Sequence, residues 1–198
     1  TDEAPDTANR PFDENRSGFL FSQGGSGIVI LESEQHARDR GAACHAAIRG
    51  MSITSDANSL AAISEENNAI ELMFKNLLQD SGLTANEIQY VNAHGTSTLQ
   101  NDPIEARILE RVFPSRPLVN STKGLLGHTI GASGAIEFIV TVLSMRDQRV
   151  HGCRNLERPV VDLNYPRDAT DATIDFASTH SFGFGGHNAG LMLERLAG

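Results

Sequence analysis

The sequence has no hydrophobic run that is long enough to cross a membrane. No apolar stretch approaches the roughly 20 residues that a transmembrane helix needs, and no charged start followed by an apolar stretch suggests a signal peptide. We therefore expect a soluble, cytoplasmic protein that does not enter a membrane. Internal repeats and low-complexity linkers are also absent. The 198 residues, 39% of them hydrophobic, thus indicate one structural unit with a substantial core.

Cysteine and basic residues are scarce. Cys44 and Cys153 form no CxxC pair and no cysteine–histidine cluster, so neither a disulfide framework nor a metal site is indicated. We interpret both as ordinary structural or surface residues, because reactive thiols are rare. The chain has 16 Lys and Arg against 25 Asp and Glu, a net charge of −9. That balance argues against nucleic acid as a partner, because a phosphate backbone would be repelled.

Strand and helix patterns alternate along the chain. Strands are predicted at 19–21, 28–31, 42–52, 88–91 and 118–120, and helices at 34–41, 65–80, 102–112 and 131–146. This order indicates an α/β protein. Extended pieces at 173–177 and 189–194 flank a glycine-rich turn and predict an antiparallel hairpin that closes the edge of a mixed sheet. The first dozen residues read as a surface segment, with order from about Phe12.

Two histidines lie in glycine-flanked turns where predicted strands end, and this is where an α/β protein presents side chains to a ligand. His94 lies in VNAHGTST (91–98), and His128 follows STKGLLG (121–127). A neutral imidazole donates one hydrogen bond, and the adjacent glycine lets a ligand approach the backbone. Two alternatives stay open. His94 can be a loop residue that caps the helix near Asp102, and the small residues after His128 can belong to a tightly packed buried helix.

Four motifs, in this order, resemble the C-terminal half of a β-ketoacyl-acyl carrier protein synthase of the elongating, synthase II-like type. They are VNAHGTST (91–98), NDPIEA (101–106), STK with GH and GASGAIE (121–137), and SFGFGGHN (181–188). RPFD (10–13) and RSGF (16–19) also match, so the resemblance runs from about Arg10 to the end. Any single motif would be weak evidence, whereas four in the right order make coincidence improbable.

The resemblance implies a thiolase-like α/β fold, in which two similar halves each contribute a mixed five-stranded sheet packed by helices. Residues 1–32 would be an N-terminal segment with the closing strands of the first half, and residues 33–198 the C-terminal domain. The family's cysteine nucleophile belongs to the first half and has no counterpart in this chain. The 198-residue chain alone is therefore expected not to carry out the family's reaction.

That reaction is the decarboxylative Claisen condensation of malonyl carrier protein with an acyl thioester, in fatty acid or polyketide chain elongation. The resemblance makes His94 and His128 the donors to the enolate oxygen. It makes Lys123 the residue that orders them, with Glu137 as its buried partner. The alternative for Lys123 is a surface lysine at a helix start. Asp102 and Glu105 read as helix N-terminal charges that favour the dipole rather than as acid–base catalysts.

Other residues are assigned to the substrate. Thr96 and Thr98 would bind the pantetheine arm, while Phe184 would offer a backbone N–H and a ring that gates the acyl chain. Phe182 reads as core packing. The resemblance implies no cofactor in the protein itself, because the substrates ride on the phosphopantetheine of acyl carrier protein. That acidic partner would have to dock on local arginines such as 107, 111 and 146.

The resemblance also bears on the assembly of the complete protein and on two alternative functions. The complete protein would be a homodimer or heterodimer, and this chain would need the half that bears the cysteine. A non-catalytic chain-length factor is the alternative, disfavoured because a scaffold does not need His94, Lys123 and His128. A thiolase is disfavoured because the terminal turn lacks a second cysteine. QGGSG (23–27) and His187 depart from the common family pattern and leave the substrate type open.

Overall fold

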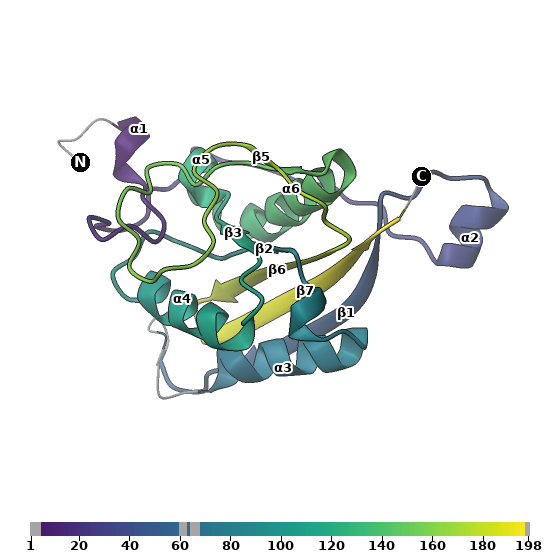
Figure 1. Cartoon of the computed structure of the whole chain (residues 1–198), viewed down its shortest axis with the longest axis horizontal. Coiled ribbons are helices and arrows are strands. Elements are labelled where there is room, and N and C mark those ends of the chain that lie inside the picture. Colours follow the sequence, from purple (N-terminus) through teal and green to yellow (C-terminus); the bar gives the residue numbers. More distant parts are fainter. Residues whose placement is uncertain (1–4, 60–62, 64–67, 197–198) are drawn as a thin grey trace.

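The computed structural model describes residues 5–59, 63 and 68–196, which form a layered α/β structure (Figure 1). The helices are α1 (Pro5–Ala8), α2 (Glu34–Asp39), α3 (Ala69–Ser81), α4 (Asn101–Val112), α5 (Lys123–Leu126) and α6 (Ser133–Asp147), with 3-10 turns at Ala85–Glu87 and Ile130–Ala132. The strands are β1 (Ala46–Ser55), β2 (Tyr90–Asn92), β3 (Leu118–Asn120), β4 (Arg149–Val150), β5 (Thr170–Asp171), β6 (Phe176–Gly183) and β7 (His187–Arg195).

A five-stranded sheet forms the middle layer, with the strand order β1-β7-β6-β2-β3. β7 pairs antiparallel with both β1 and β6, whereas β2 runs parallel to both β6 and β3. The mixed five-stranded sheet expected from the sequence is therefore confirmed. Because β2 and β3 are parallel neighbours, their carboxyl ends meet at one edge, and the loops that carry His94 and Lys123 start side by side.

Helices cover both faces of the sheet, with α3 and α4 on one side and α6 on the other (Figure 1). The larger core cluster, around Phe74 and Leu109, lies on the side of α3 and α4; a smaller one around Tyr90 and Met145 lies on the side of α6. Side chains of β6 alternate between these faces. β6 can therefore place side chains on both faces of the sheet next to a site that lies at the end of the strand.

Most predicted elements are confirmed to within a few residues. β3 occupies 118–120 as predicted, α4 begins one residue early, and α6 begins at Ser133 because Ile130–Ala132 forms a 3-10 turn. Residues 65–67 of the predicted helix 65–80 lie outside the described residues. α3 ends at Ser81 and is capped by Gly82, whose φ of 70° suits a residue without Cβ. The short helix predicted at 34–41 is α2, which ends at Asp39.

The predicted strand at 28–31 is wrong. These residues pair with no strand in the described part of the chain, and Ile28 and Ile30 are 89% and 83% exposed. An apolar run supplies side chains for a strand, but a strand also needs a neighbour for its backbone hydrogen bonds. Residues 19–21 likewise form only one isolated bridge, between Phe21 and His128.

Three other expectations need correction. The β6–β7 hairpin exists, but it lies inside the sheet, because β1 pairs along the outer side of β7. β1 also begins at Ala46 rather than 42, so Cys44 precedes the strand. Of the predicted surface segment, the described residues 5–12 are more than a surface stretch, since α1 is followed by buried Asn9, whose side-chain amide donates to the carbonyl of Lys123.

Candidate active site

The loop that follows β2 is anchored by the carboxylate of Glu105 on α4. One oxygen of Glu105 accepts the backbone N–H of His94 at 2.7 Å, and the other accepts that of Gly95 at 2.8 Å. His94 and Glu105 are both buried. The two bonds fix the backbone at the residue that carries the imidazole. The alternative that His94 caps α4 is therefore wrong. The contact runs the other way, because a side chain of α4 accepts the backbone N–H groups of the His94 loop.

Asp102 holds the rest of this loop. Its carboxylate accepts the N–H groups of Thr96, Ser97 and Thr98 at 3.1, 3.0 and 3.3 Å, and that of Phe12 at 2.7 Å. Burial raises the pKa of Asp102 to about 6. The interpretation of Asp102 and Glu105 as helix N-terminal charges is therefore incomplete. Both are buried acceptors that shape the loop, and no sequence pattern indicated their burial.

Gly95 lies where the His94 loop comes closest to Ser121. Its φ is 40°, and a Cβ placed on it would lie 2.5 Å from Ser121 Cβ and 2.9 Å from Phe12 Cε2. We expect Gly95→Ala to lower the free energy of unfolding by about 3 kcal/mol, because overpacking adds to a backbone that L side chains rarely adopt. Urea denaturation measures this. Gly131→Ala is the matched control, since no atom lies within 4 Å of its Cβ position; equal stability of the two variants would contradict the prediction.

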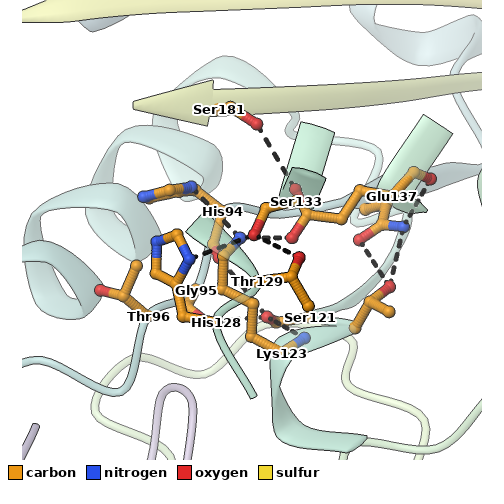
Figure 2. A network of polar contacts seen from close by, with 12 residues as sticks. His94, Gly95, Thr96, Ser121, Lys123, His128, Thr129, Ser133, Glu137 and Ser181 are labelled. Carbon is orange, nitrogen blue, oxygen red and sulfur yellow. Dashed lines mark hydrogen bonds and ion pairs between the residues drawn. The ribbon is translucent and has the colours of Figure 1, made fainter. Parts of the chain in front are cut away.

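Lys123, the first residue of α5, is buried beneath the His94 loop with 2% of its surface exposed. Its Nζ donates to the carbonyl oxygen of His94 at 2.7 Å, lies 3.3 Å from His94 Nδ1 and forms an ion pair with the carboxylate of Glu137 on α6 (Figure 2). The alternative of a surface lysine is therefore wrong. Burial raises the pKa of Glu137 above its usual value, although Lys123 opposes this.

The contact with Lys123 selects the tautomer of His94. An ammonium group only donates, so Nδ1 of His94 accepts and its hydrogen resides on Nε2. Burial first, and then the charge of Lys123, hold the pKa of His94 well below its usual value. His94 is thus a neutral ring with its N–H on the side away from the lysine.

His128 reaches the same tautomer by different contacts. Its Nδ1 accepts the backbone N–H of Ile130 at 3.0 Å, and Ser133 Oγ lies 3.1 Å from the same nitrogen. The hydrogen of this half-buried ring is therefore on Nε2. Burial, followed by the charge of Lys123, lowers the pKa of His128 to about 4. The two imidazole rings lie 5.9 Å apart between centroids and are nearly perpendicular to each other. Both are labelled in Figure 2.

The two rings share one cleft of about 630 Å³ at the carboxyl edge of β2 and β3. Thr96 and Thr98 line it, and their hydroxyl oxygens lie 2.9 Å apart. Phe184, 73% exposed, lines it from the β6–β7 turn. Phe182 is buried in the core as expected, with its ring 5.3 Å from that of His94. Lys123 and Glu137, which form an ion pair with each other, are not among the residues that line the cleft.

Residues after His128 also face the cleft. Gly131, Ser133 and Gly134 line it, and a Cβ at Gly131 would meet no atom within 4 Å. The alternative of a buried helix start is therefore wrong, because Gly131 and Gly134 are exposed, but close packing is present at Ala135, whose Cβ would lie 3.0 Å from a Cβ on Gly27. Cys153 fits the interpretation of an ordinary thiol, because burial raises its pKa to about 12 and keeps it protonated at neutral pH.

His128 should remain neutral far below pH 7. An ordinary histidine titrates near pH 6.5, whereas the pKa of His128 is lowered to about 4. Between these values the unfolded chain binds a proton at this residue and the folded chain does not, so its contribution to stability falls as the pH drops from about 6.5 to 4. NMR titration of the ring should give a midpoint near 4; a midpoint near 6.5 would contradict the burial argument.

The family described as Beta-ketoacyl synthase, C-terminal domain, matches residues 45–157, more than half of the chain. The chain belongs to the β-ketoacyl synthase family. The matched range includes His94, Lys123, His128 and Glu137, while the β6–β7 turn with Phe184 lies beyond it. In the part of the chain that the structure describes, no helix is long and apolar enough to span a bilayer.

Known β-ketoacyl synthases are similar to this chain over nearly its whole length. The chain is 38% identical to the 3-oxoacyl-(acyl-carrier-protein) synthase 2 of Coxiella burnetii over an alignment 198 positions long, which covers 97% of this chain and 48% of that synthase. A solved ketosynthase in complex with its type II PKS acyl-carrier protein, bound to the hexaketide, has a TM-score of 0.93 at 30% identity and covers 98% of this chain and 50% of its own.

A second solved structure, the ishigamide ketosynthase/chain length factor, has a TM-score of 0.91 at 31% identity, over 98% of this chain and 48% of its own. These similarities confirm the thiolase-like ketosynthase fold. The chain spans about half the length of the curated relatives and solved chains that it matches.

Proposed function

We propose that this chain is the histidine-bearing half of an elongating 3-oxoacyl-acyl carrier protein synthase, acting in fatty acid or polyketide chain elongation. The observation that carries the proposal is the pair His94 and His128, because both rings are neutral, both have the hydrogen on Nε2, and both line one cleft. Residues 1–32 would belong with the first half of the fold and residues 33–198 would form the C-terminal domain.

The reaction begins with malonyl carrier protein in the cleft. The bond between the carboxylate carbon and the α-carbon breaks, carbon dioxide leaves, and the electron pair forms an enolate whose negative charge lies on the thioester oxygen. His94 and His128 would each donate Nε2–H to that oxygen. Fixed donors of this kind contribute about 2.7–4 kcal/mol each in a site that excludes water. A neutral ring is the form needed to donate without losing a proton to the enolate.

The enolate carbon then attacks the acyl thioester on a cysteine that another polypeptide segment supplies. A carbon–carbon bond forms, the carbon–sulfur bond breaks, and the electron pair returns to the cysteine sulfur. The backbone N–H of Phe184 would stabilise the second oxyanion, and its exposed ring would gate the acyl chain. Thr96 and Thr98 would bind the pantetheine arm, which requires no cofactor in this chain.

The complete enzyme would contain this chain, the half with the cysteine nucleophile, and a second copy or a related subunit in a cytoplasmic dimer. Acyl carrier protein would be the transient partner. Of the arginines expected to meet it, Arg111 and Arg146 are about half exposed and pair with Glu71 and Asp147. Such surface pairs are weak enough to leave both arginines available to an acidic partner.

A chain-length factor is the second candidate, because the ishigamide structure contains both kinds of subunit. A subunit that only shapes an acyl tunnel has no use for a buried lysine or two rings held as donors. The intact contacts of Lys123 with His94 and Glu137 therefore favour the catalytic proposal.

Reconstitution tests the proposal. The chain alone should form no ketoacyl product from acyl and malonyl carrier proteins, whereas the chain co-expressed with a nucleophile-bearing first half should form it. The matched control is the same pair with the cysteine of the first half changed to alanine. Product from the chain alone, or no product from a folded two-half complex, would overturn the proposal.

A further inference from the structure

A third histidine, His180 on β6, is buried next to Glu105, the residue that anchors the His94 loop. Its Nε2 lies 2.6 Å from Oε1 of Glu105, and both side chains are fully buried. The ring of Phe74 lies 4.8 Å away and that of Phe182 5.2 Å away, between ring centroids. Within the described chain, Nδ1 of His180 has no hydrogen-bond partner. The contact with Glu105 is therefore the polar contact of a ring that lies between aromatic side chains.

Glu105 is the residue that fixes the His94 loop, and its carboxylate accepts hydrogen bonds from four donors. Besides the N–H groups of His94 and Gly95, it accepts from Asn101 Nδ2 at 2.9 Å and from His180 Nε2 at 2.6 Å. Because a carboxylate only accepts, the hydrogen in the last bond belongs to Nε2 of His180. Burial alone would raise the pKa of Glu105, but these bonds, led by that of His180, hold it below its usual value.

We infer that His180 is a positioning residue for His94, acting through Glu105; this inference rests on the proposed function. Oε1 of Glu105 is shared between His180 Nε2 and the backbone N–H of His94, so one donor locates the acceptor of the other. β6 is thereby connected to α4 across 75 residues of sequence, and through Glu105 on α4 to the loop after β2. A second route runs through Phe182, whose ring lies 5.2 Å from His180 and 5.3 Å from His94.

An ordinary core histidine would make a different prediction. If His180 served only to fill space, an aromatic ring of similar shape would replace it without local effect on the loop. If it positions Glu105, its loss leaves a buried carboxylate oxygen with one donor fewer. The backbone bonds of His94 and Gly95 to that carboxylate should then weaken, whereas neighbouring bonds that avoid Glu105 should not.

Ala93 supplies the internal reference. Its N–H precedes that of His94 in the chain but donates to the carbonyl of Asn120 on β3, at 2.8 Å. Tyr165→Phe supplies the matched control variant, because the Tyr165 hydroxyl lies in the same core cluster and has no hydrogen-bond partner among the described residues. Amide hydrogen exchange of the full chain compares these positions without substrate.

In His180→Phe, exchange at His94 and Gly95 should accelerate about tenfold or more relative to Ala93, as expected for losing a hydrogen bond to a charged group. His180→Gln, which retains an N–H donor, should restore most of the protection, and Tyr165→Phe should leave all three amides unchanged. Unchanged exchange in His180→Phe, equal acceleration at Ala93, or His180→Gln as fast as His180→Phe would each overturn the inference.

A measurement on the wild-type chain keeps the inference testable if His180→Phe does not fold. The nitrogen-15 shift of His180 should show a hydrogen on Nε2, and an unprotonated Nε2 would overturn the inference. Failure of this inference is distinct from failure of the proposed function. The proposed function is tested by measuring malonyl decarboxylation for His94→Ala in the complex with a nucleophile-bearing half. Unchanged decarboxylation in that variant would remove the function and leave the exchange result standing.

Discussion

Replacing His94 or His128 by alanine is expected to lower the rate of malonyl decarboxylation by about a hundred- to a thousandfold in a synthase that joins this chain to a nucleophile-bearing half. Each variant removes one donor from the oxygen on which the enolate charge develops. The rate of carbon dioxide release from malonyl carrier protein measures the loss. KM should change little, because the donor acts on charge that is absent from the ground state.

The double variant separates this role from general damage to the cleft. Both rings are proposed to donate to the same oxygen, so the loss in the His94→Ala, His128→Ala double variant should be smaller than the product of the single losses. His36→Ala is the matched control, because His36 is an exposed histidine on α2 and does not line the cleft. Full decarboxylation in either single variant would contradict the assignment.

The placement of His94, Lys123 and His128 could be predicted because it depends on local patterns. Short apolar strands end directly before both loops, and the glycines allow the backbone to turn there. Once β2 and β3 are parallel neighbours, the two loops start at the same edge of the sheet. The resemblance then gave the chemistry, and the structure supplied the contacts that select the tautomers, to which Ile130 and Ser133 contribute without a sequence signal.

Other contacts could not be predicted because they join distant segments. Whether a carboxylate in the first turn of a helix is solvated or buried depends on what the fold places against it, and for Asp102 that is Phe12, 90 residues away. The contact of Glu105 with His180 and the pairing of β1 with β7 also join segments that are far apart in the sequence. The strand predicted at 28–31 is wrong for a related reason. The apolar pattern there is clear, but it does not indicate whether another strand lies alongside to form hydrogen bonds.

Lys123→Met should be the most destabilising substitution in the site. It leaves the carboxylate of Glu137 buried without its partner, and removing one member of a buried ion pair costs about 3–5 kcal/mol. Chemical denaturation should show this loss, whereas Lys75→Met, at an exposed position of α3, should change stability little. Equal stability of the two variants would contradict the burial of the pair.

A second substitution separates the stability of Lys123 from its role at the histidines. Adding Glu137→Leu to Lys123→Met removes both charges, so most of the stability should return. Decarboxylation should not return, because Nδ1 of His94 then lacks the donor that keeps the hydrogen on Nε2. The pKa of His128 should also rise above about 4, since the charge of Lys123 is one cause of its depression. A stable double variant with full activity would show that the lysine only fills the core.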